Sequence, residues 1–282
     1  MVFSSHASGW LPAGYYNDPA AYERSHAPAA KRGKARSWTA PESFPPLEPF
    51  PAVKSLGQDR GSNSASYEME MDDFVAAIPY RMEYVLLDAC LSGCVEVAWA
   101  LRDKADVVGF SQAEVLADGF DYATITQRLL GGEPDPISVC EDYFQFYDTQ
   151  EGTNRSATIS VVAPGKMDRL CAVCSRLFEK YRDKIASLSG NSVQGYFRSE
   201  RHYFYDLQDI LVKAGITQEE QAELQAALDE CVLYKAATPS FLSFRIRTYC
   251  GFSMYLPSMG TDLLDSFYKE HISWNSATHL VN

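Results

Sequence analysis

One unbroken apolar strand constrains the fold of this chain more than any other feature. A strand is expected over Met82–Leu87, and apart from Glu83 this run contains no charged side chain, whereas a strand with one face in solvent alternates apolar and polar residues. Such a run is typical of a parallel strand that helices cover on both faces. The run therefore predicts a layered α/β sheet.

The rest of the chain alternates between helix-like and strand-like segments, as a layered α/β sheet requires. Strands are expected at 105–110 and 156–163, and a pair of strands at 241–247 and 251–256. Helices are expected at 69–78, 91–104, 122–130, 137–149, 167–185, 206–214, 219–234 and 263–272. With 282 residues, the chain is expected to form a single domain over 1–282.

A proline-rich insert interrupts this pattern at about residues 13–66. Loops of such length without apolar periodicity are uncommon in compact domains, and they are often functional or disordered. The insert contains a basic run, formed by Lys31, Arg32, Lys34 and Arg36. The run is interpreted either as a solvated linker or as a site of proteolytic nicking.

Charge and composition exclude several classes of function. The net charge of −12 argues against nucleic acid and anionic membrane as partners. No stretch approaches the roughly 20 apolar residues of a membrane span, and no signal peptide opens the chain. Seven cysteines, an odd number, do not suggest a disulfide framework, and Cys171-x-x-Cys174 lacks the second ligand pair of a zinc site. No metal or other cofactor is expected, and a calcium requirement leaves no readable signature.

His6 and Cys90 each follow a short apolar run, where a buried strand meets a turn of small residues. Catalytic groups of open α/β sheets lie at such strand ends, and a nearby imidazole activates a thiol. A helix predicted to start at about Leu91 would place its positive end at the Cys90 sulfur. Asp88 lies two residues before Cys90, so its side chain points to the same side of the strand.

These segments resemble the clostripain family of cysteine endopeptidases, in the caspase–gingipain–legumain clan. The histidine segment is Ser5-His6-Ala7-Ser8-Gly9-Trp10, and the cysteine segment is Leu87-Asp88-Ala89-Cys90-Leu91-Ser92-Gly93-Cys94. Further similarity covers Phe110–Glu114, Asp118–Tyr122, Tyr205–Asp209, Gly251–Pro257 and Trp274–Thr278. The resemblance spans nearly the whole chain apart from the proline-rich insert.

The resemblance implies a caspase-like α/β/α sandwich with a mostly parallel sheet, from which the family's N-terminal strands are missing. It implies that Cys90 is the nucleophile, that His6 is the general acid/base, and that the backbone N–H groups of Ala7 and Cys90 form the oxyanion hole. Asp88, with Asp118 beside it, would select Arg or Lys at the cleavage site of a protein or peptide substrate. The resemblance also implies a secreted or envelope protein of a bacterium, activated by autolytic cleavage after Lys31, Arg32, Lys34 or Arg36.

Two departures from the family pattern keep other functions open. Ala7 stands where the clan has glycine, and the chain begins inside the histidine strand, so a separate N-terminal chain or segment would be needed to complete the sheet. Both features favour a homologue that binds peptides without turnover. A different cysteine hydrolase, such as an amidase, would not need Asp88.

Overall fold

The computed structural model describes residues 1–5, 7–15, 19–26, 69–197 and 202–282, and the backbone of 53–54, 59–60 and 66–67. In this part of the chain a five-stranded sheet has the order β1-β5-β6-β8-β10. Its strands are β1 (Val2–Ser4), β5 (Met82–Asp88), β6 (Ala105–Phe110), β8 (Thr158–Val162) and β10 (Val232–Ala237).

The strand predicted from the apolar run is confirmed as β5. Its second half is fully buried, because β1 and β6 flank it in the sheet and helices lie above and below. β1 pairs with it in parallel, with Ser4 opposite Asp88. The carboxyl ends of the two strands therefore coincide, which brings the segments that follow them to the same edge of the sheet.

The far half of the sheet is antiparallel, because β8 runs opposite to both β6 and β10. β10 was not predicted: its first residues were assigned to a helix over 219–234, but that helix ends at Cys231. The predicted pairing of 241–247 with 251–256 is wrong as well. Short ladders replace it, in which β11 (Ser240–Phe241) pairs with β12 (Phe244–Arg245) and β13 (Ser253–Met254) pairs with β9 (Tyr205–Asp206).

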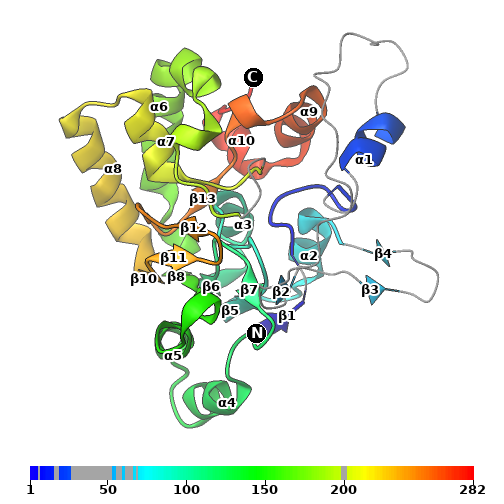
Figure 1. Cartoon of the computed structure of the whole chain (residues 1–282), viewed down its shortest axis with the longest axis vertical. Coiled ribbons are helices and arrows are strands. Elements are labelled where there is room, and N and C mark those ends of the chain that lie inside the picture. Colours follow the sequence, from blue (N-terminus) through cyan, green and yellow to red (C-terminus); the bar gives the residue numbers. More distant parts are fainter. Residues whose placement is uncertain are drawn as a thin grey trace.

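Helices cover both faces of the sheet, and this confirms the α/β/α sandwich. Figure 1 shows α4 and α5 below the sheet and α3, α6, α8 and α10 above it. The helices are α1 (Pro19–His26), α2 (Met71–Ala77), α3 (Val95–Ala100), α4 (Tyr122–Leu130), α5 (Pro136–Asp148), α6 (Asp168–Ser187), α7 (Leu207–Ala214), α8 (Gln218–Cys231), α9 (Asp262–His271) and α10 (Ser273–Thr278). Short 3₁₀ helices lie at Gly152–Asn154, Pro164–Lys166, Gly190–Ser192 and Pro257–Met259.

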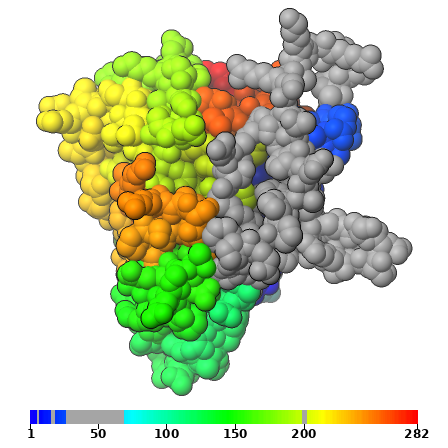
Figure 2. Space-filling view, viewed as in Figure 1, coloured from blue at the N-terminus to red at the C-terminus, as the bar shows by residue number. Residues whose placement is uncertain are grey.

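Several helix ends follow directly from the sequence. Thr217 and Glu220 form a capping box at the start of α8, in which each side chain accepts from the other residue's backbone N–H. Asp206 caps α7, and Gly215 ends it in the left-handed conformation. In the space-filling view, α7 and α8 form the upper left of the molecule, and α4 and α5 form its lower end (Figure 2).

The proline-rich interval contains more regular structure than its composition indicates. α1 lies in it, together with β2 (Val53–Lys54), β3 (Asp59–Arg60) and β4 (Ser66–Tyr67). β3 and β4 pair with each other, and β2 pairs with β7 (Val115–Leu116) from the body of the protein. In the described part of the chain, no helix combines the length and apolar character that a membrane crossing needs.

Candidate active site

Cys90 lies two residues beyond the carboxyl end of β5, where its thiol is held by the backbone of β7. The Val115 N–H donates to Cys90 Sγ at 3.2 Å, and the Val115 carbonyl oxygen lies 3.7 Å from the same sulfur. Only 1% of the residue is exposed. The Val115 N–H and carbonyl groups thus fix the position of the sulfur, with the N–H as the donor and the carbonyl oxygen as an acceptor for the thiol.

The turn after Cys90 differs from the prediction that a helix starts at Leu91. Leu91 has a positive φ of 56°, and the helix begins only at Val95. The reason lies in the hydrogen bonds of the turn, because Leu91 N–H donates to Ala113 O and Gly93 N–H donates to Ser111 O. These bonds tie the turn to the segment after β6, so the predicted helix-dipole contribution at Cys90 is wrong. A left-handed leucine is strained, and such strain is concentrated at functional sites.

His6 lies outside the described residues, but its neighbours approach the turn that carries Cys90. Ser5 N–H donates to Asp88 O at 3.3 Å. Gly9 has a φ of +60°, and a Cβ at this position would lie 2.6 Å from Leu91 O. Only glycine permits this backbone conformation and this close approach without strain. Ala7, predicted to serve the oxyanion hole, is 1% exposed.

Asp88 is fully buried at the end of β5. Its Oδ2 atom accepts hydrogen bonds from Ser4 Oγ at 2.9 Å and from the Tyr122 hydroxyl at 2.7 Å. Burial is the largest cause that raises the pKa of Tyr122, to about 12, and the Asp88 carboxylate adds to it. Both donors are neutral hydroxyl groups, so they orient the Asp88 carboxyl group without bringing a positive charge to it.

Two tyrosines of α5 lie near this carboxylate. Burial raises the pKa of Tyr143 well above its usual range, and the charges of Tyr147, Asp88 and Cys90 add to this effect. The rings of Tyr143 and Tyr147 meet edge to face, with centroids 4.9 Å apart, and the Tyr147 hydroxyl donates to Gly119 O. Neither tyrosine was predicted as a site residue, although their spacing of four on a predicted helix indicates a shared face.

Asp118, predicted beside Asp88, is exposed on the loop between β7 and α4. Burial is the largest cause that raises the pKa of Tyr147, and the charges of Asp118 and then of Asp88 add to it. Both carboxylates therefore act on the same tyrosine, one from the protein interior and one from the surface. A basic side chain that reached past Asp118 toward Asp88 would meet negative charge along its path.

β7 has a second partner besides the thiol. Lys54 pairs with Val115, and Val53 pairs with Leu116, in an antiparallel register. A segment of the proline-rich interval thus lies beside the strand that contacts Cys90. The basic residues predicted as cleavage sites, Lys31, Arg32, Lys34 and Arg36, lie outside the described residues.

The cysteines and acidic residues form no metal centre in the part of the chain that the structure describes. There, no group of three or more His, Cys, Asp or Glu side chains is arranged to hold an ion. All seven cysteines are buried free thiols, including Cys171 and Cys174 on α6. The arrangement around Cys90 and Asp88 can therefore provide a thiol at a strand end and a buried negative charge near it.

Comparison with protein families gives one match, to the clostripain family of peptidases, over residues 45–277. This interval covers well over half of the chain. A comparison with curated protein sequences finds no match.

Solved structures of similar proteins include an inactive zymogen C11 protease from Parabacteroides distasonis. It is 26% identical, with a TM-score of 0.72, and the match covers 98% of this chain and 69% of the zymogen. A secreted C11 cysteine protease from Bacteroides thetaiotaomicron is 26% identical over 99% of this chain and 71% of its own, with a TM-score of 0.73. A clostripain from the same organism, in complex with the peptide inhibitor BTN-VLTK-AOMK, is 27% identical over 77% of this chain and 97% of its own, with a TM-score of 0.67.

Proposed function

Because this chain belongs to the clostripain family of cysteine proteases, we propose that it is an endopeptidase that cleaves after Arg or Lys. Cys90 is the nucleophile in this proposal, and His6 is the general acid/base. The observation that supports it most directly is the juxtaposition of the Cys90 turn with the buried carboxylate of Asp88 and with the segment that carries His6.

In the proposed reaction, His6 takes the thiol proton and the Cys90 sulfur attacks the carbonyl carbon of the scissile peptide bond. The oxyanion that forms accepts hydrogen bonds from the backbone N–H groups of Cys90 and Ala7. His6 then protonates the departing amine, which leaves a thioester on Cys90. A water molecule, deprotonated by His6, attacks the thioester and releases the carboxylic acid product and the free enzyme.

The specificity in this proposal comes from Asp88. A guanidinium or ammonium group at the end of a substrate side chain would pair with its carboxylate, and charge-assisted bonds of this kind are roughly twice as strong as neutral ones. Tyr143 and Tyr147 would contact the aliphatic stem, and Asp118 would attract the cation at the entrance. The inhibitor bound to the Bacteroides thetaiotaomicron clostripain contains the sequence VLTK, which ends in a basic residue.

We also propose that β2 occupies the position of a substrate strand in an uncleaved precursor. The pairing of Val53–Lys54 with β7 resembles the way an extended peptide adds to a sheet edge. Cleavage between His6 and Cys90 would release this segment. The candidate bonds are those after Lys31, Arg32, Lys34 and Arg36, and the register on β7 adds the bond after Lys54.

Two further proposals concern the location of the enzyme and the pairing partner of β1. We propose secretion or an envelope location, because one similar C11 protease is described as secreted. We also propose that a further segment or a separate chain pairs with β1. Among the described residues β1 is an edge strand, bonded only to β5, and such an edge offers unpaired backbone groups.

Fluorogenic peptide amides that differ only in the residue before the cleaved bond test the specificity. We expect Arg above Lys and negligible turnover after Leu or Glu, because a carboxyl group near the cleavage site attracts a cationic side chain and offers nothing to an apolar or acidic one. Asp88→Asn should lower kcat/KM for the Arg substrate by about a hundredfold or more, as expected when a partner of a charge-assisted bond is lost. Asp142→Asn, at a partly buried carboxylate of α5 that pairs with Arg128, serves as the matched control. Equal rates of cleavage after Arg and after Leu would show that Asp88 does not select the substrate side chain. Binding of the Arg peptide without turnover would establish the non-catalytic alternative.

Autolysis is tested by incubating purified protein and sequencing the new N-termini. The bond after one of the basic residues named above should be cut in the active protein and remain intact in Cys90→Ala. Replacing Lys31, Arg32, Lys34, Arg36 and Lys54 by Gln should leave a single inactive chain. Full activity of that uncut variant would refute the role of cleavage.

A further inference from the structure

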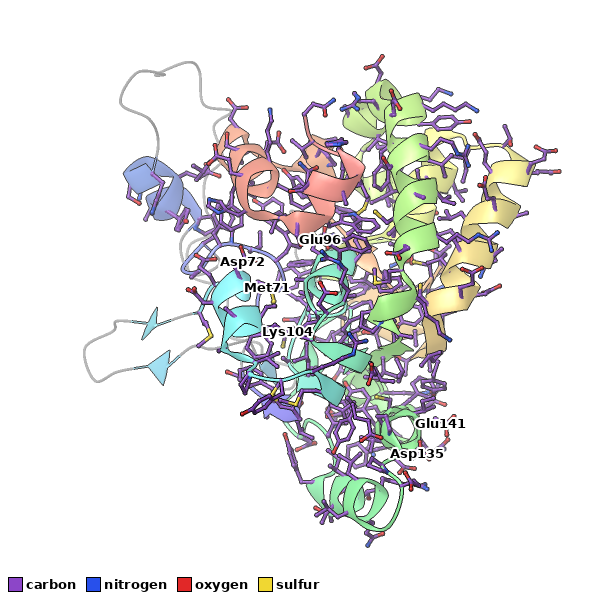
Figure 3. All side chains as sticks on the ribbon, turned by 180° about the vertical axis from the view of Figure 1, so that it is seen from behind. Met71, Asp72, Glu96, Lys104, Asp135 and Glu141 are labelled. Carbon is purple, nitrogen blue, oxygen red and sulfur yellow. The ribbon has the colours of Figure 1, made fainter. Side chains whose placement is uncertain are left out.

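A pocket of about 520 Å³ lies between α1, α2, α3 and α9, apart from the residues assigned to catalysis. Neither Cys90, Asp88 nor Asp118 lines it. Figure 3 shows Met71 and Asp72 on α2 next to Glu96 on α3, and all three line the pocket. Its size is that of a small-ligand or side-chain site.

Two buried polar atoms of the lining lack a hydrogen-bond partner among the described residues: Trp10 Nε1 and Glu96 Oε2. Glu96 is only 2% exposed. Its other oxygen, Oε1, accepts from Tyr255 N–H at 2.9 Å and from the Tyr268 hydroxyl at 2.8 Å. The Cys94 thiol also donates a hydrogen bond to this carboxyl group, and a thiol is a weak donor. Buried polar atoms are nearly always paired, so two residues of the lining each carry an atom that a ligand reaching it could satisfy.

The rim of the pocket is strongly acidic. The acidic side chains that line it, in addition to Glu96, are Glu70, Asp72, Asp73 and Glu270. The basic side chains in the lining are His26 and His271. The carboxyl end of α9 lies at the same rim, and the partial negative charge of a helix end also favours cations. Negative charge around a partly enclosed space concentrates positively charged ligands there.

We infer that this pocket binds a lysine or arginine side chain of a peptide. The ammonium or guanidinium group would donate to Glu96 Oε2, and its aliphatic stem would lie against the rings of Tyr22 and Phe267. The indole N–H of Trp10 needs an acceptor, which a backbone carbonyl of the peptide supplies and a free alkyl cation does not. This requirement favours a peptide over a small amine. The site is distinct from the Asp88 pocket and does not depend on the proposed specificity.

The test uses the full chain carrying Cys90→Ala and Asp88→Asn, so that neither cleavage nor the proposed Asp88 pocket contributes. Calorimetry measures binding of the acetylated, amidated peptide Lys-Arg-Gly-Lys-Ala-Arg, of its version with Gln at every basic position, and of n-butylguanidinium. We expect the basic peptide to bind more tightly than either of the others, and its affinity to fall as salt is raised.

When Glu96→Gln is introduced into the protein that carries Cys90→Ala and Asp88→Asn, peptide binding should weaken at least about tenfold, as expected when a hydrogen bond to a charged group is lost. Trp10→Phe should reduce the affinity for the peptide and leave that for n-butylguanidinium unchanged. Glu141→Gln, an exposed position on α5 far from the pocket, is the matched control and should have no effect (Figure 3). Glu270→Gln, at the exposed rim, provides a second variant if Glu96→Gln does not fold.

Equal binding of the basic peptide and its Gln version would overturn the inference. Unchanged affinity in both Glu96→Gln and Glu270→Gln would also overturn it. Binding of n-butylguanidinium as tight as that of the peptide would refute the role given to Trp10 and, with it, the assignment to a peptide.

Discussion

Replacing Glu96 with glutamine should remove a pH dependence of stability that this one carboxyl group imposes. Glu96 lies on α3 with 2% of its surface exposed, between Tyr255 and Tyr268. Burial outweighs the hydrogen bonds of Tyr255 and Tyr268 and raises the pKa of Glu96 from 4.5 to about 7. The folded protein therefore retains a proton at pH values where the unfolded chain has lost it.

The sign and size of the effect follow from this shift. Between about pH 4.5 and pH 7 the unfolded state binds fewer protons, so the free energy of unfolding falls as the pH rises through that interval. A shift of about 2.5 pKa units, at about 1.4 kcal/mol per unit, corresponds to about 3 kcal/mol. Glutamine cannot ionise, so the free energy of unfolding of Glu96→Gln does not include this fall with pH. The stability of Glu96→Gln relative to the parent should therefore increase by about 3 kcal/mol from pH 4 to pH 8.

Urea unfolding at several pH values measures this difference, with Cys90→Ala as the parent to prevent autolysis. Other titrating groups are common to both proteins and cancel in the comparison. The exposed Glu141→Gln should show a difference that stays within about 0.5 kcal/mol at every pH. A similarly flat difference for Glu96→Gln would refute the raised pKa of Glu96 in the folded protein. A cation bound beside Glu96 would favour its ionised form.

Two other substitutions test the geometry of the site. Tyr122→Phe removes a donor from Asp88, and we expect kcat/KM for an Arg substrate to fall about fivefold to tenfold, with no change for a Leu substrate in steady-state assays. Gly9→Ala places a Cβ 2.6 Å from Leu91 O at a φ of +60°, so it should destabilise the fold by about 1–3 kcal/mol in thermal unfolding. Gly165→Ala, which has no close contact with the backbone, should be tolerated; equal stability of the two alanine variants would contradict the account of Gly9.

The central strand could be predicted because its evidence is local. The centre of β5, from Tyr84 to Leu87, is an uninterrupted apolar run, and a strand buried on both faces leaves that pattern in the sequence. β10 could not be found in this way, because Val232–Ala237 follows α8 directly without a Gly or Pro between them, and its residues are half exposed. Its strand conformation depends on pairing with β8, which is a long-range contact.

In the candidate site, too, some residues could be predicted from local sequence and others depend on long-range packing. Strand alternation predicted Asp88 on the side of Cys90, but β5 ends at Asp88 and Cys90 follows in the turn, so the alternation does not extend to the thiol. Val115 on β7 and Tyr143 on α5 reach the same region only through tertiary packing, so no spacing in the sequence identified them. The turn after Cys90 was mistaken for helix because Leu91 adopts a left-handed conformation that leucine rarely takes.

The central claim, that Cys90 is the nucleophile of a protease specific for basic residues, is tested most directly by covalent labelling. The enzyme is treated with a thiol-reactive peptidyl inhibitor that ends in Arg, and the intact protein and its peptides are weighed by mass spectrometry. All seven cysteines are buried in the structure, so chance alkylation of the others should be slow. We predict one adduct per chain, on Cys90, that is absent from His6→Ala and from an otherwise identical inhibitor ending in Leu. An adduct on any other cysteine, or equal labelling by both inhibitors, would contradict the account.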